Sequence, residues 1–544
     1  MKKKVAVVGG VAGGMSCAAR IKRLDRDVEV VVFERGPDVS FANCGMPYYI
    51  GGVIRSRAAM AVQTPAGLSA RYGLDIRTRH EVAAVDTAAK TVRVRALGSG
   101  EEFEEAYDAL VLATGAEPLR LPVPGADLSH VHALNNLSDM DRIAEAAANA
   151  KTACIIGGGF IGLELAENLH ARGLKITIVE LMDQVLAPMD KEMTAPLLQE
   201  LEIYGVDTRL GDSATAIEPG AVTLKSGARV DADLVCMCAG VKPRSALAAA
   251  AGIETGPRGH IVVDGRMRTS APDVYAVGDA VQSRCTVSGE PVAIPLAGPA
   301  NRQGRIAADV ICGRDSEYIG IQGSSIVKVF DVAAGQTGLT EKRLKALGLP
   351  YRRAYLHPSQ HAGYYPGAYP VDIKLLFSPE GKIYGVQATG AEGVDVVVDT
   401  IATAMRGGLT VYDLEELELA YSPQWGAAKH GVNMTGFVAA NILRGDMDVV
   451  EPDAIPGDAF LLDVRKPEEA ALGMIPGATV IPVDELSGRL DELPRDRAIA
   501  AYCGVGLRAY IACRLLTQAG FAAANINGGF TTWRAFNPPP AGQS

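Results

Sequence analysis

The sequence has no surplus of positive charge and no long apolar run. Its 544 residues include 53 Lys and Arg against 63 Asp and Glu, a net charge of −10, so no nucleic-acid or anionic-membrane partner is indicated. No apolar stretch reaches the roughly 18 residues that a transmembrane helix needs. Hydrophobic residues make up 48% of the chain, which excludes a largely disordered or fibrous protein.

The cysteines and histidines form no metal or disulfide pattern. The nine cysteines are odd in number and contain no C-x-x-C pair, which predicts reduced thiols in a cytoplasmic protein. The eight histidines are scattered, and no zinc site or Ser/His/Asp set is predicted. Cys236 and Cys238 share one face of an expected strand, so core packing is favoured over a metal pair.

Glycine is abundant, with 60 residues, and it clusters twice after an expected buried strand. Strands are expected at 4–8 and 28–33, and again at 152–156 and 175–179. A helix is expected between the strands of each pair, and an acid, Glu34 or Glu180, closes each unit. The glycines that begin the two turns are Gly9, Gly10, Gly13 and Gly14, and then Gly157, Gly159 and Gly162. Two such β-α-β units predict an internal duplication of a dinucleotide-binding fold.

The second unit matches G-x-G-x-x-G at every glycine. Glycine there lets backbone N–H groups and a helix N-terminus approach a pyrophosphate. Glu180 is expected to accept hydrogen bonds from the adenosine ribose, and residues 181–183 include no Arg or Lys for a 2′-phosphate. The pattern therefore predicts NADH rather than NADPH.

The first unit departs from the pattern, because Val11 stands where the second glycine belongs. Its N-terminal position and the later Gly278-Asp279 pair indicate the FAD half of a flavoprotein that binds two dinucleotides. Asp279 is expected to bond the ribityl or phosphate region of the flavin. It can also serve as a helix N-cap.

Cys44 lies in SFANCGMPYYIGG, after the first unit. No other cysteine occurs between Cys17 and Cys154, so a dithiol site is excluded and Cys44 acts alone or with a substrate thiol. The Gly-Met-Pro turn and helix start predict a loop that stabilises a thiolate. An ordinary buried cysteine is the alternative, and the local sequence favours neither.

Cys503 begins CGVGLR, ahead of a helical stretch. Six residues that end in Arg508 predict a compact loop of N–H groups around one sulfur, suited to holding a persulfide anion. A glycine turn with an incidental cysteine is the alternative, and LLDVR upstream weighs against it.

Two further groups of residues are candidates for the substrate site. Arg20, Arg23 and Arg71 either form solvated helix faces or bind the phosphates of a large anionic thiol. The segments 361–370 and 420–431 are rich in aromatics, which either fill a core or donate a proton to a leaving thiolate.

These motifs together resemble the single-cysteine pyridine nucleotide–disulfide oxidoreductases. Among them the chain is similar to the coenzyme A-disulfide reductases fused to a rhodanese domain, a group that includes NADH-dependent persulfide reductases. The resemblance spans nearly all of the chain and is most specific at VVGGVAGGMS, SFANCGMPYYIGG, ATG at 113–115, GGGFIGLE, VYAVGDA and CGVGLR.

The resemblance implies an α/β protein with four parts. They are two Rossmann-like domains for FAD and NAD, an α+β dimerisation domain and a C-terminal rhodanese-like α/β domain. The expected ranges are 1–118 and 241–320 for FAD, 119–240 for NAD, 321–446 for dimerisation, 447–456 for a linker in a Pro- and Gly-rich stretch, and 457–544 for the rhodanese domain. A homodimer is implied, in which the C-terminal region of one subunit completes the site of the other.

The resemblance also assigns roles to residues. Cys44 is the redox nucleophile that forms a mixed disulfide with coenzyme A, and Cys503 with Arg508 handles sulfane sulfur. Either Tyr364 or Tyr365 aligns with the family tyrosine. The other implied cofactor contacts are Arg35, Asn43, Thr114 and Gly115, and the implied contacts to coenzyme A and the disulfide are Arg20, Arg23, Ser40, Asn43, Arg71, Asn301, Tyr421 and Lys429.

The expected reaction is NADH-dependent reduction of a persulfide, a polysulfide or coenzyme A disulfide through FAD. Two alternatives stay open at this point. An NADH oxidase or peroxidase would carry a Cys44 sulfenic acid, and a redox sensor or sulfur carrier would not turn over. The fused C-terminal domain argues against the oxidase, and the two dinucleotide units argue against a non-enzymatic protein.

Overall fold

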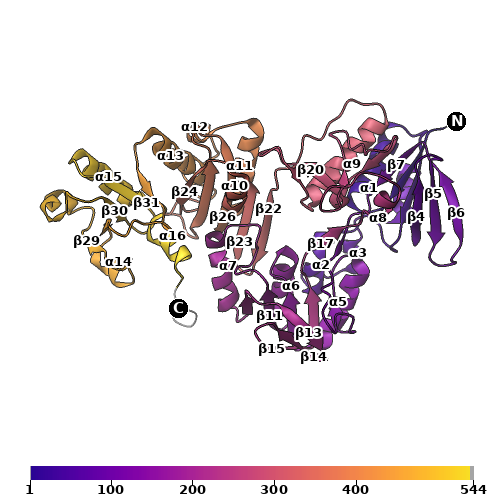
Figure 1. Cartoon of the computed structure of the whole chain (residues 1–544), viewed down its shortest axis with the longest axis horizontal. Helices are drawn as coiled ribbons and strands as arrows, with labels where there is room; N and C mark the ends of the chain where they lie inside the picture. Colours follow the sequence, from indigo (N-terminus) through magenta and orange to yellow (C-terminus); the bar gives the residue numbers. More distant parts are fainter. Residues whose placement is uncertain (1, 539–544) are drawn as a thin grey trace. The chain divides into compact units, whose positions relative to one another are not determined.

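The computed structural model describes residues 2–538, which form two compact units (Figure 1). Within the described residues, the first unit comprises 2–183 and 205–323, and the second comprises 184–204 and 324–538. Among the described helices, none combines the length and the apolar character needed to cross a membrane.

The first unit is built on two parallel five-stranded sheets. One has the order β19-β7-β1-β2-β3, and the other has the order β12-β11-β10-β16-β9. The strands of the first sheet are β1 (Lys4–Val8), β2 (Glu29–Glu34), β3 (Asp75–Thr78), β7 (Ala109–Leu112) and β19 (Val274–Ala276). Those of the second are β9 (Val131–His132), β10 (Thr152–Ile156), β11 (Lys175–Glu180), β12 (Asp207–Leu210) and β16 (Leu234–Met237). The four strands expected in the glycine units are thus confirmed within one residue.

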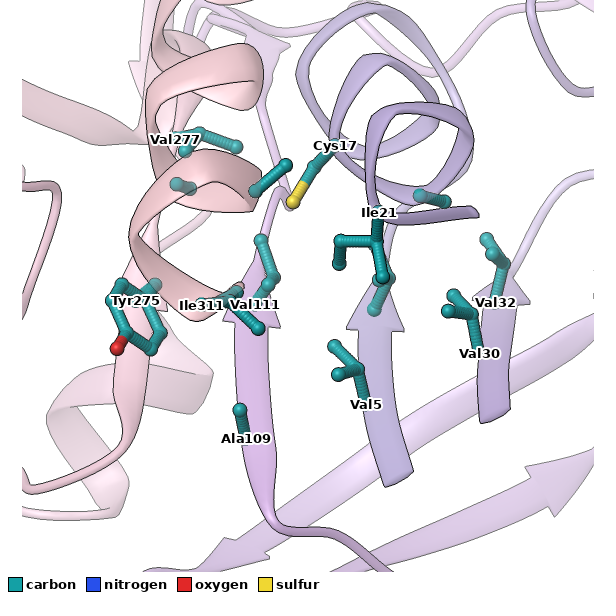
Figure 2. Close-up of a cluster of buried hydrophobic side chains, with 14 of the residues drawn as sticks. Val5, Cys17, Ile21, Val30, Val32, Ala109, Val111, Tyr275, Val277 and Ile311 are labelled. Atoms are coloured by element: carbon teal, nitrogen blue, oxygen red, sulfur yellow. The ribbon is translucent and has the colours of Figure 1, made fainter. Parts of the chain in front are cut away.

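Two helices cover one face of the first sheet. Helix α1 (Ala12–Leu24) lies over β1 and packs along α9 (Ala297–Ile311). Figure 2 shows Cys17 and Ile21 of α1 pointing toward Val5 and the neighbouring strands. Valines at alternate strand positions fill this core, as expected where a parallel sheet is buried on both faces.

Smaller elements surround the two sheets of the first unit. The helices are α2 (Met46–Ile50), α3 (Arg57–Met60), α4 (Pro65–Tyr72), α5 (Leu137–Asn149), α6 (Phe160–His170) and α8 (Ala246–Ala250). The strands of the small antiparallel sheets are β4 (His80–Asp86), β5 (Thr91–Ala96) and β6 (Glu102–Ala106), then β13 (Ala214–Glu218), β14 (Gly220–Leu224) and β15 (Arg229–Ala232). The remaining strands are β8 (Ala116–Pro118), β17 (Val241–Pro243), β18 (Ile261–Val262), β20 (Val281–Arg284) and β21 (Pro291–Val292).

The second unit contains an antiparallel sheet with the order β22-β23-β26-β25-β24. Its strands are β22 (Ser325–Val329), β23 (Val332–Gly338), β24 (Arg352–Leu356), β25 (Val371–Phe377) and β26 (Ile383–Gly390). The helices around it are α7 (Lys191–Ile203), α10 (Glu341–Leu347), α11 (Val394–Gly407), α12 (Val411–Glu415) and α13 (Gly431–Arg444). Helix α7 lies inside the range expected for the NAD domain, yet it packs on β23 and β26 of this unit.

The same unit contains a parallel sheet with the order β27-β31-β30-β28-β29 (Figure 1, yellow). Its strands are β27 (Val449–Val450), β28 (Phe460–Asp463), β29 (Thr479–Val480), β30 (Ile499–Tyr502) and β31 (Ala523–Ile526), with helices α14 (Pro467–Ala471), α15 (Leu507–Gln518) and α16 (Gly529–Phe536). Strand β27 begins inside the segment expected to be a linker, and it pairs with β31.

A buried ionic cluster surrounds Lys374 on β25. Its Nζ lies 2.9 Å from Asp190, 2.5 Å from Glu192 and 2.6 Å from Glu341, and its side chain is 0% exposed. Burial alone would lower the pKa of Lys374, but the three carboxylates raise it. The three acids group as metal ligands do, and the ammonium already supplies the cation among them.

Arg353 extends this cluster to the parallel sheet. Its guanidinium binds Glu341 at 2.9 Å and Glu451 at 2.7 Å, and it also binds Asp453. The Asn527 amide after β31 donates to the Arg353 carbonyl at 2.9 Å. The two sheets of the second unit therefore share buried polar contacts, and removing one partner of such a contact destabilises the fold.

Candidate functional site

The first glycine turn joins β1 to α1. Gly9 has φ +104°, and a Cβ added at Gly14 would lie 1.9 Å from the Gly9 carbonyl oxygen, so a side chain is excluded there. Val11 stands at the N-cap and offers no capping side chain, so the first N–H groups of α1 remain suited to a phosphate. Glu34 accepts hydrogen bonds from the N–H groups of Gly10 at 2.8 Å and Gly36 at 2.7 Å.

Asp279 lies in the 3-10 turn Gly278–Ala280 after β19. The turn is held by Gln303, whose Oε1 accepts from the Gly278 N–H at 2.8 Å. Burial raises the pKa of Asp279. A half-buried acceptor beside a bare glycine turn fits a hydroxyl-bearing dinucleotide such as FAD.

The second glycine turn repeats this geometry between β10 and α6. Gly157 has φ +112°, and a Cβ at Gly162 would lie 1.9 Å from the Gly157 oxygen, whereas nothing lies within 4 Å of a Cβ at Gly159. Glu180 accepts from the N–H groups of Gly158 at 2.7 Å and Met182 at 2.8 Å. The carboxylate is therefore fixed at the strand end, where a ribose hydroxyl would meet it.

We expect the enzyme to prefer NADH over NADPH by about tenfold or more in kcat/KM. The exposed Leu181 and Met182 offer no cation to a 2′-phosphate, which would meet the Glu180 carboxylate instead. Steady-state rates with the two nucleotides at one fixed oxidant concentration measure the ratio. Glu180→Ser should reduce it, and equal or better kcat/KM with NADPH would contradict the assignment.

Cys44 is exposed, in the 3-10 turn Asn43–Gly45 that leads into α2. The loop is tied to the first glycine turn, because the Ser40 N–H donates to the Gly10 carbonyl at 2.9 Å. Burial raises the pKa of the Cys44 thiol, and the carboxylates of Glu164 and Asp279 raise it further, while a backbone hydrogen bond opposes them. The backbone hydrogen bond favours the thiolate, as expected of the loop, but burial and then the two acids outweigh it. That the loop stabilises a thiolate stays a prediction.

The three arginines of the candidate anion site differ in their contacts. Arg20 is half-buried, and its Nε donates to Asp309 at 2.9 Å. Arg23, at the end of α1, and Arg71, in the last turn of α4, are exposed, and these two helices pack on each other. In this unit, Asn301 accepts a hydrogen bond from the Ser16 hydroxyl and donates to the Ala297 carbonyl at 2.8 Å.

The aromatic segments of the second unit meet on its surface. The hydroxyls of Tyr364 and Tyr421 lie 2.8 Å apart, and this hydrogen bond raises the pKa of Tyr364. Tyr365 accepts from the Gln424 amide at 3.2 Å, and Lys429 is exposed. The tyrosines are not core residues, since Tyr364 is 76% exposed and Tyr421 is 49% exposed.

Cys503 lies at the end of β30, at the base of the CGVGLR loop. The Gly506 N–H donates to its Sγ at 3.2 Å, and Gly506 has φ +97°. The Cys503 carbonyl accepts a hydrogen bond from the Phe530 N–H at 2.8 Å, and a Cβ added at Gly529 would lie 2.6 Å from the same carbonyl oxygen. The Gly506 N–H thus points at the sulfur in a compact loop next to the start of α15, and the expected ring of several N–H groups around the sulfur stays a prediction.

Arg508 completes the loop. Its two guanidinium nitrogens donate to Glu469 at 2.7 and 2.6 Å, and this pairing lowers the pKa of Glu469 to about 2. Glu469 was not identified as a site residue from the sequence. Its position close after the LLDVR segment, six residues after Asp463, could have indicated it.

Family models match three consecutive parts of the chain. Residues 3–304 match the pyridine nucleotide-disulphide oxidoreductases. The chain belongs to this family. Residues 324–429 match its dimerisation domain, and residues 450–536 match the rhodanese-like domain. This pyridine nucleotide-disulphide oxidoreductase uses FAD and a nicotinamide nucleotide, which confirms the cofactors expected from the two glycine turns.

Similar proteins cover most or all of the oxidoreductase. A coenzyme A disulfide reductase from Staphylococcus aureus (strain JH9) is 36% identical over 440 residues, which are 80% of this chain and 99% of that protein. The crystal structure of reduced Bacillus anthracis CoADR-RHD has a TM-score of 0.97 and 44% identity, with 99% of each chain covered. An NAD-dependent persulfide reductase from A. fulgidus has a TM-score of 0.91 and 34% identity, with 97% of this chain and 100% of that chain covered.

The fold class expected from the sequence is confirmed. In each unit the glycine turn and its closing acid lie together at the strand ends. Thr114 and Gly115 follow β7, and the Thr114 nitrogen would lie 3.5 Å from a Cβ added at Gly9 of the first turn. Arg35 follows Glu34 and is exposed. The roles of the individual site residues remain predictions, and so do the domain boundaries.

Proposed function

We propose that the oxidoreductase is an FAD-dependent NADH:persulfide, polysulfide or coenzyme A-disulfide reductase. One observation carries the proposal: the same chain holds a lone exposed cysteine tied to the first glycine turn and a second cysteine enclosed in a persulfide-type loop. The similar proteins from S. aureus and A. fulgidus, named for coenzyme A disulfide and persulfide, support it.

Each part of the chain has a role in the proposed reaction. Gly157–Gly162 and Glu180 hold NADH, and Gly9–Gly14, Glu34 and Asp279 hold FAD. Bound FAD supplies a two-electron relay between the nicotinamide and sulfur. Cys44 alternates between a thiol or thiolate and a mixed disulfide with coenzyme A. The exposed side chains of Arg23 and Arg71 are suited to bind the phosphates of coenzyme A.

The overall reduction of a persulfide consumes one proton. RSSH, NADH and one proton give RSH, hydrogen sulfide and NAD⁺, with the two electrons of the nucleotide breaking the S–S bond. Cys503 is proposed to receive or present the sulfane sulfur, with N–H groups of its loop stabilising the terminal anion.

We further propose a cytoplasmic homodimer. The nine cysteines are all free thiols, which suits a reducing compartment. The exposed aromatics around the Tyr364–Tyr421 pair, with Trp425 80% exposed, suit a protein interface, and the family match includes a dimerisation domain. The partner's Tyr421 would then lie near the disulfide as a hydrogen-bond donor to the leaving thiolate.

The test is steady-state kinetics of the purified flavoprotein with NADH and three oxidants: a coenzyme A persulfide, inorganic polysulfide and coenzyme A disulfide. We expect NADH oxidation with at least one of them, and release of hydrogen sulfide from the first two. NADH oxidation by oxygen or hydrogen peroxide alone at matching rates would favour the oxidase or peroxidase instead.

A further inference from the structure

Helix α16 supports the CGVGLR loop with its first turn. The Phe530 N–H donates to the Cys503 carbonyl at 2.8 Å. The next N–H, of Thr531, donates to the Gly504 carbonyl at 3.0 Å. A Cβ added at Gly529 would lie 2.6 Å from the Cys503 oxygen and 3.0 Å from the Gly504 oxygen, so the loop packs directly on the backbone of the helix. The position of α16 therefore sets the backbone that carries the Cys503 sulfur.

Thr532, one residue further along α16, bonds to an imidazole of the antiparallel sheet. Its Oγ1 lies 2.8 Å from Nε2 of His357, which follows β24. The other ring nitrogen, Nδ1, lies 2.5 Å from Oδ1 of Asp372 on β25. With the Nδ1 proton directed at the carboxylate, Nε2 accepts from the threonine hydroxyl. Thr532 is 3% exposed and the His357 side chain is 7% exposed, so loss of the bond between them leaves a buried polar group unpaired.

The pair of His357 and Asp372 closes the loop that carries the candidate tyrosines. It continues the pairing of β24 with β25 by one position. Just inside the pair, the Val371 N–H donates to the Pro358 carbonyl at 2.8 Å. The segment between His357 and Asp372, here called the tyrosine loop, contains Tyr364. One imidazole therefore bonds both to the base of the tyrosine loop and to the helix that supports the CGVGLR loop.

Other contacts already join the two sheets of this unit. The Asn527 amide accepts from the Tyr355 N–H at 3.0 Å and donates to the Arg353 carbonyl at 2.9 Å. These bonds attach the end of β31 to β24. The Thr532 bond differs from them in its place, because it reaches the helix whose first turn holds the Cys503 carbonyl. Its expected effect is therefore on the geometry of the sulfur more than on the attachment of the sheets.

We propose that His357 is a positioning residue for sulfur transfer: through Thr532 it fixes α16, and through α16 it fixes the backbone around Cys503. The inference rests on the proposed role of Cys503 and deepens it, because the CGVGLR loop then has a support on the dimerisation sheet. The supported step is the transfer of one sulfur atom. The Cys503 thiolate attacks a sulfane sulfur, becomes a persulfide anion and releases the donor one sulfur shorter, with charge conserved and no net oxidation.

The central test removes one hydrogen bond. Thr532→Val deletes the hydroxyl and keeps a branched side chain, so sulfur uptake at Cys503 should slow by about three- to tenfold. Holoenzyme is mixed with inorganic polysulfide, and mass spectrometry of the Cys503 peptide follows the added sulfur with time. In the same preparation, NADH-dependent reduction of coenzyme A disulfide should be unchanged, because the bond between His357 and Asp372 remains.

Further variants separate positioning from packing. Thr532→Ser restores the hydroxyl and should restore the rate of sulfur uptake. Thr532→Ala should repeat the loss, and it avoids a methyl group beside Gly528, where an added Cβ would lie 2.0 Å from the threonine oxygen. His357→Phe keeps a ring but removes both bonds, so it should lower sulfur uptake and coenzyme A disulfide reduction together. Thr517→Val, at an exposed threonine of α15, is the matched control and should leave both rates unchanged.

Unchanged sulfur uptake in Thr532→Val and Thr532→Ala would overturn the proposal, and so would a loss that Thr532→Ser does not restore. An equal loss of coenzyme A disulfide reduction in Thr532→Val would also overturn it, because the bond would then serve the fold as a whole. Retained flavin absorbance and an unaltered melting curve show that each variant is folded. Absence of added sulfur on Cys503 of the unaltered enzyme would overturn the proposed role of Cys503 itself, so the two failures are distinct.

Discussion

The Cys44→Ser variant is expected to bind flavin and accept electrons from NADH, but to lose turnover with disulfides and persulfides by a factor on the order of 10³ or more. A serine hydroxyl has a far higher pKa than a thiol and cannot form a mixed disulfide. The substitution changes neither glycine turn and neither of the acids Glu34 and Glu180, so nucleotide binding should persist. Flavin bleaching by NADH under anaerobic conditions and steady-state turnover measure the two properties separately.

A matched control is Cys312→Ser in the same unit. Cys312 is also a free, partly exposed thiol, but it lies at the end of α9, away from both glycine turns. Its substitution should leave turnover unchanged. Retention of most persulfide reductase activity by Cys44→Ser would remove the cysteine from its proposed role.

The second large effect is expected at the other sulfur loop. Cys503→Ser should strongly lower activity with polysulfide or bulky persulfides, whose sulfur is taken up first by the enclosed loop. It should leave coenzyme A disulfide reduction largely intact, because that substrate is proposed to reach Cys44 directly. Both assays are run on one preparation, so a general loss of folded enzyme affects them equally.

Cys513→Ala serves as the control for Cys503. Cys513 lies on α15 in the same domain, is buried in its core and lacks the N–H contact that Gly506 makes to Cys503. Equal loss on both substrates in Cys503→Ser would mean that the domain supports the reductase structurally. No loss on either would mean that its sulfur transfer is a separate activity.

Local patterns predicted much of the fold and part of the site. The spacing of glycines and the closing acids predicted both β-α-β units, because a dinucleotide turn imposes these residue types at short sequence separation. Cys44 and the CGVGLR loop were identified in the same way. The order of strands within each sheet was not predicted, because no local pattern specifies which strands pair.

Contacts between distant segments could not be predicted. Tyr48 and Glu164 are 116 residues apart, and nothing in either neighbourhood indicates that α2 docks on α6. The pairing of Arg20 with Asp309 is of the same kind, with 289 residues between the partners. The raised pKa of Cys44 has burial and the distant acids Glu164 and Asp279 as its causes, and the loop sequence alone, which favoured neither state of Cys44, contains no signal for them.

The ionic cluster around Lys374 and Arg353 bears on how the rhodanese-like part depends on the dimerisation sheet. A domain that is joined only by a flexible linker can be removed without loss of stability in the adjoining domain. Here Glu451, Asp453 and Asn527, all within or next to the rhodanese-like part, complete the bonding of an arginine on the dimerisation sheet. Removing one partner of a fully buried ion pair costs about 3–5 kcal/mol, and the cost here is smaller because Glu451 and Asp453 are 29% and 35% exposed. The two parts are thus structurally interdependent, and a substitution of Glu451, Asp453 or Asn527 is expected to destabilise the dimerisation sheet as well as the rhodanese-like part.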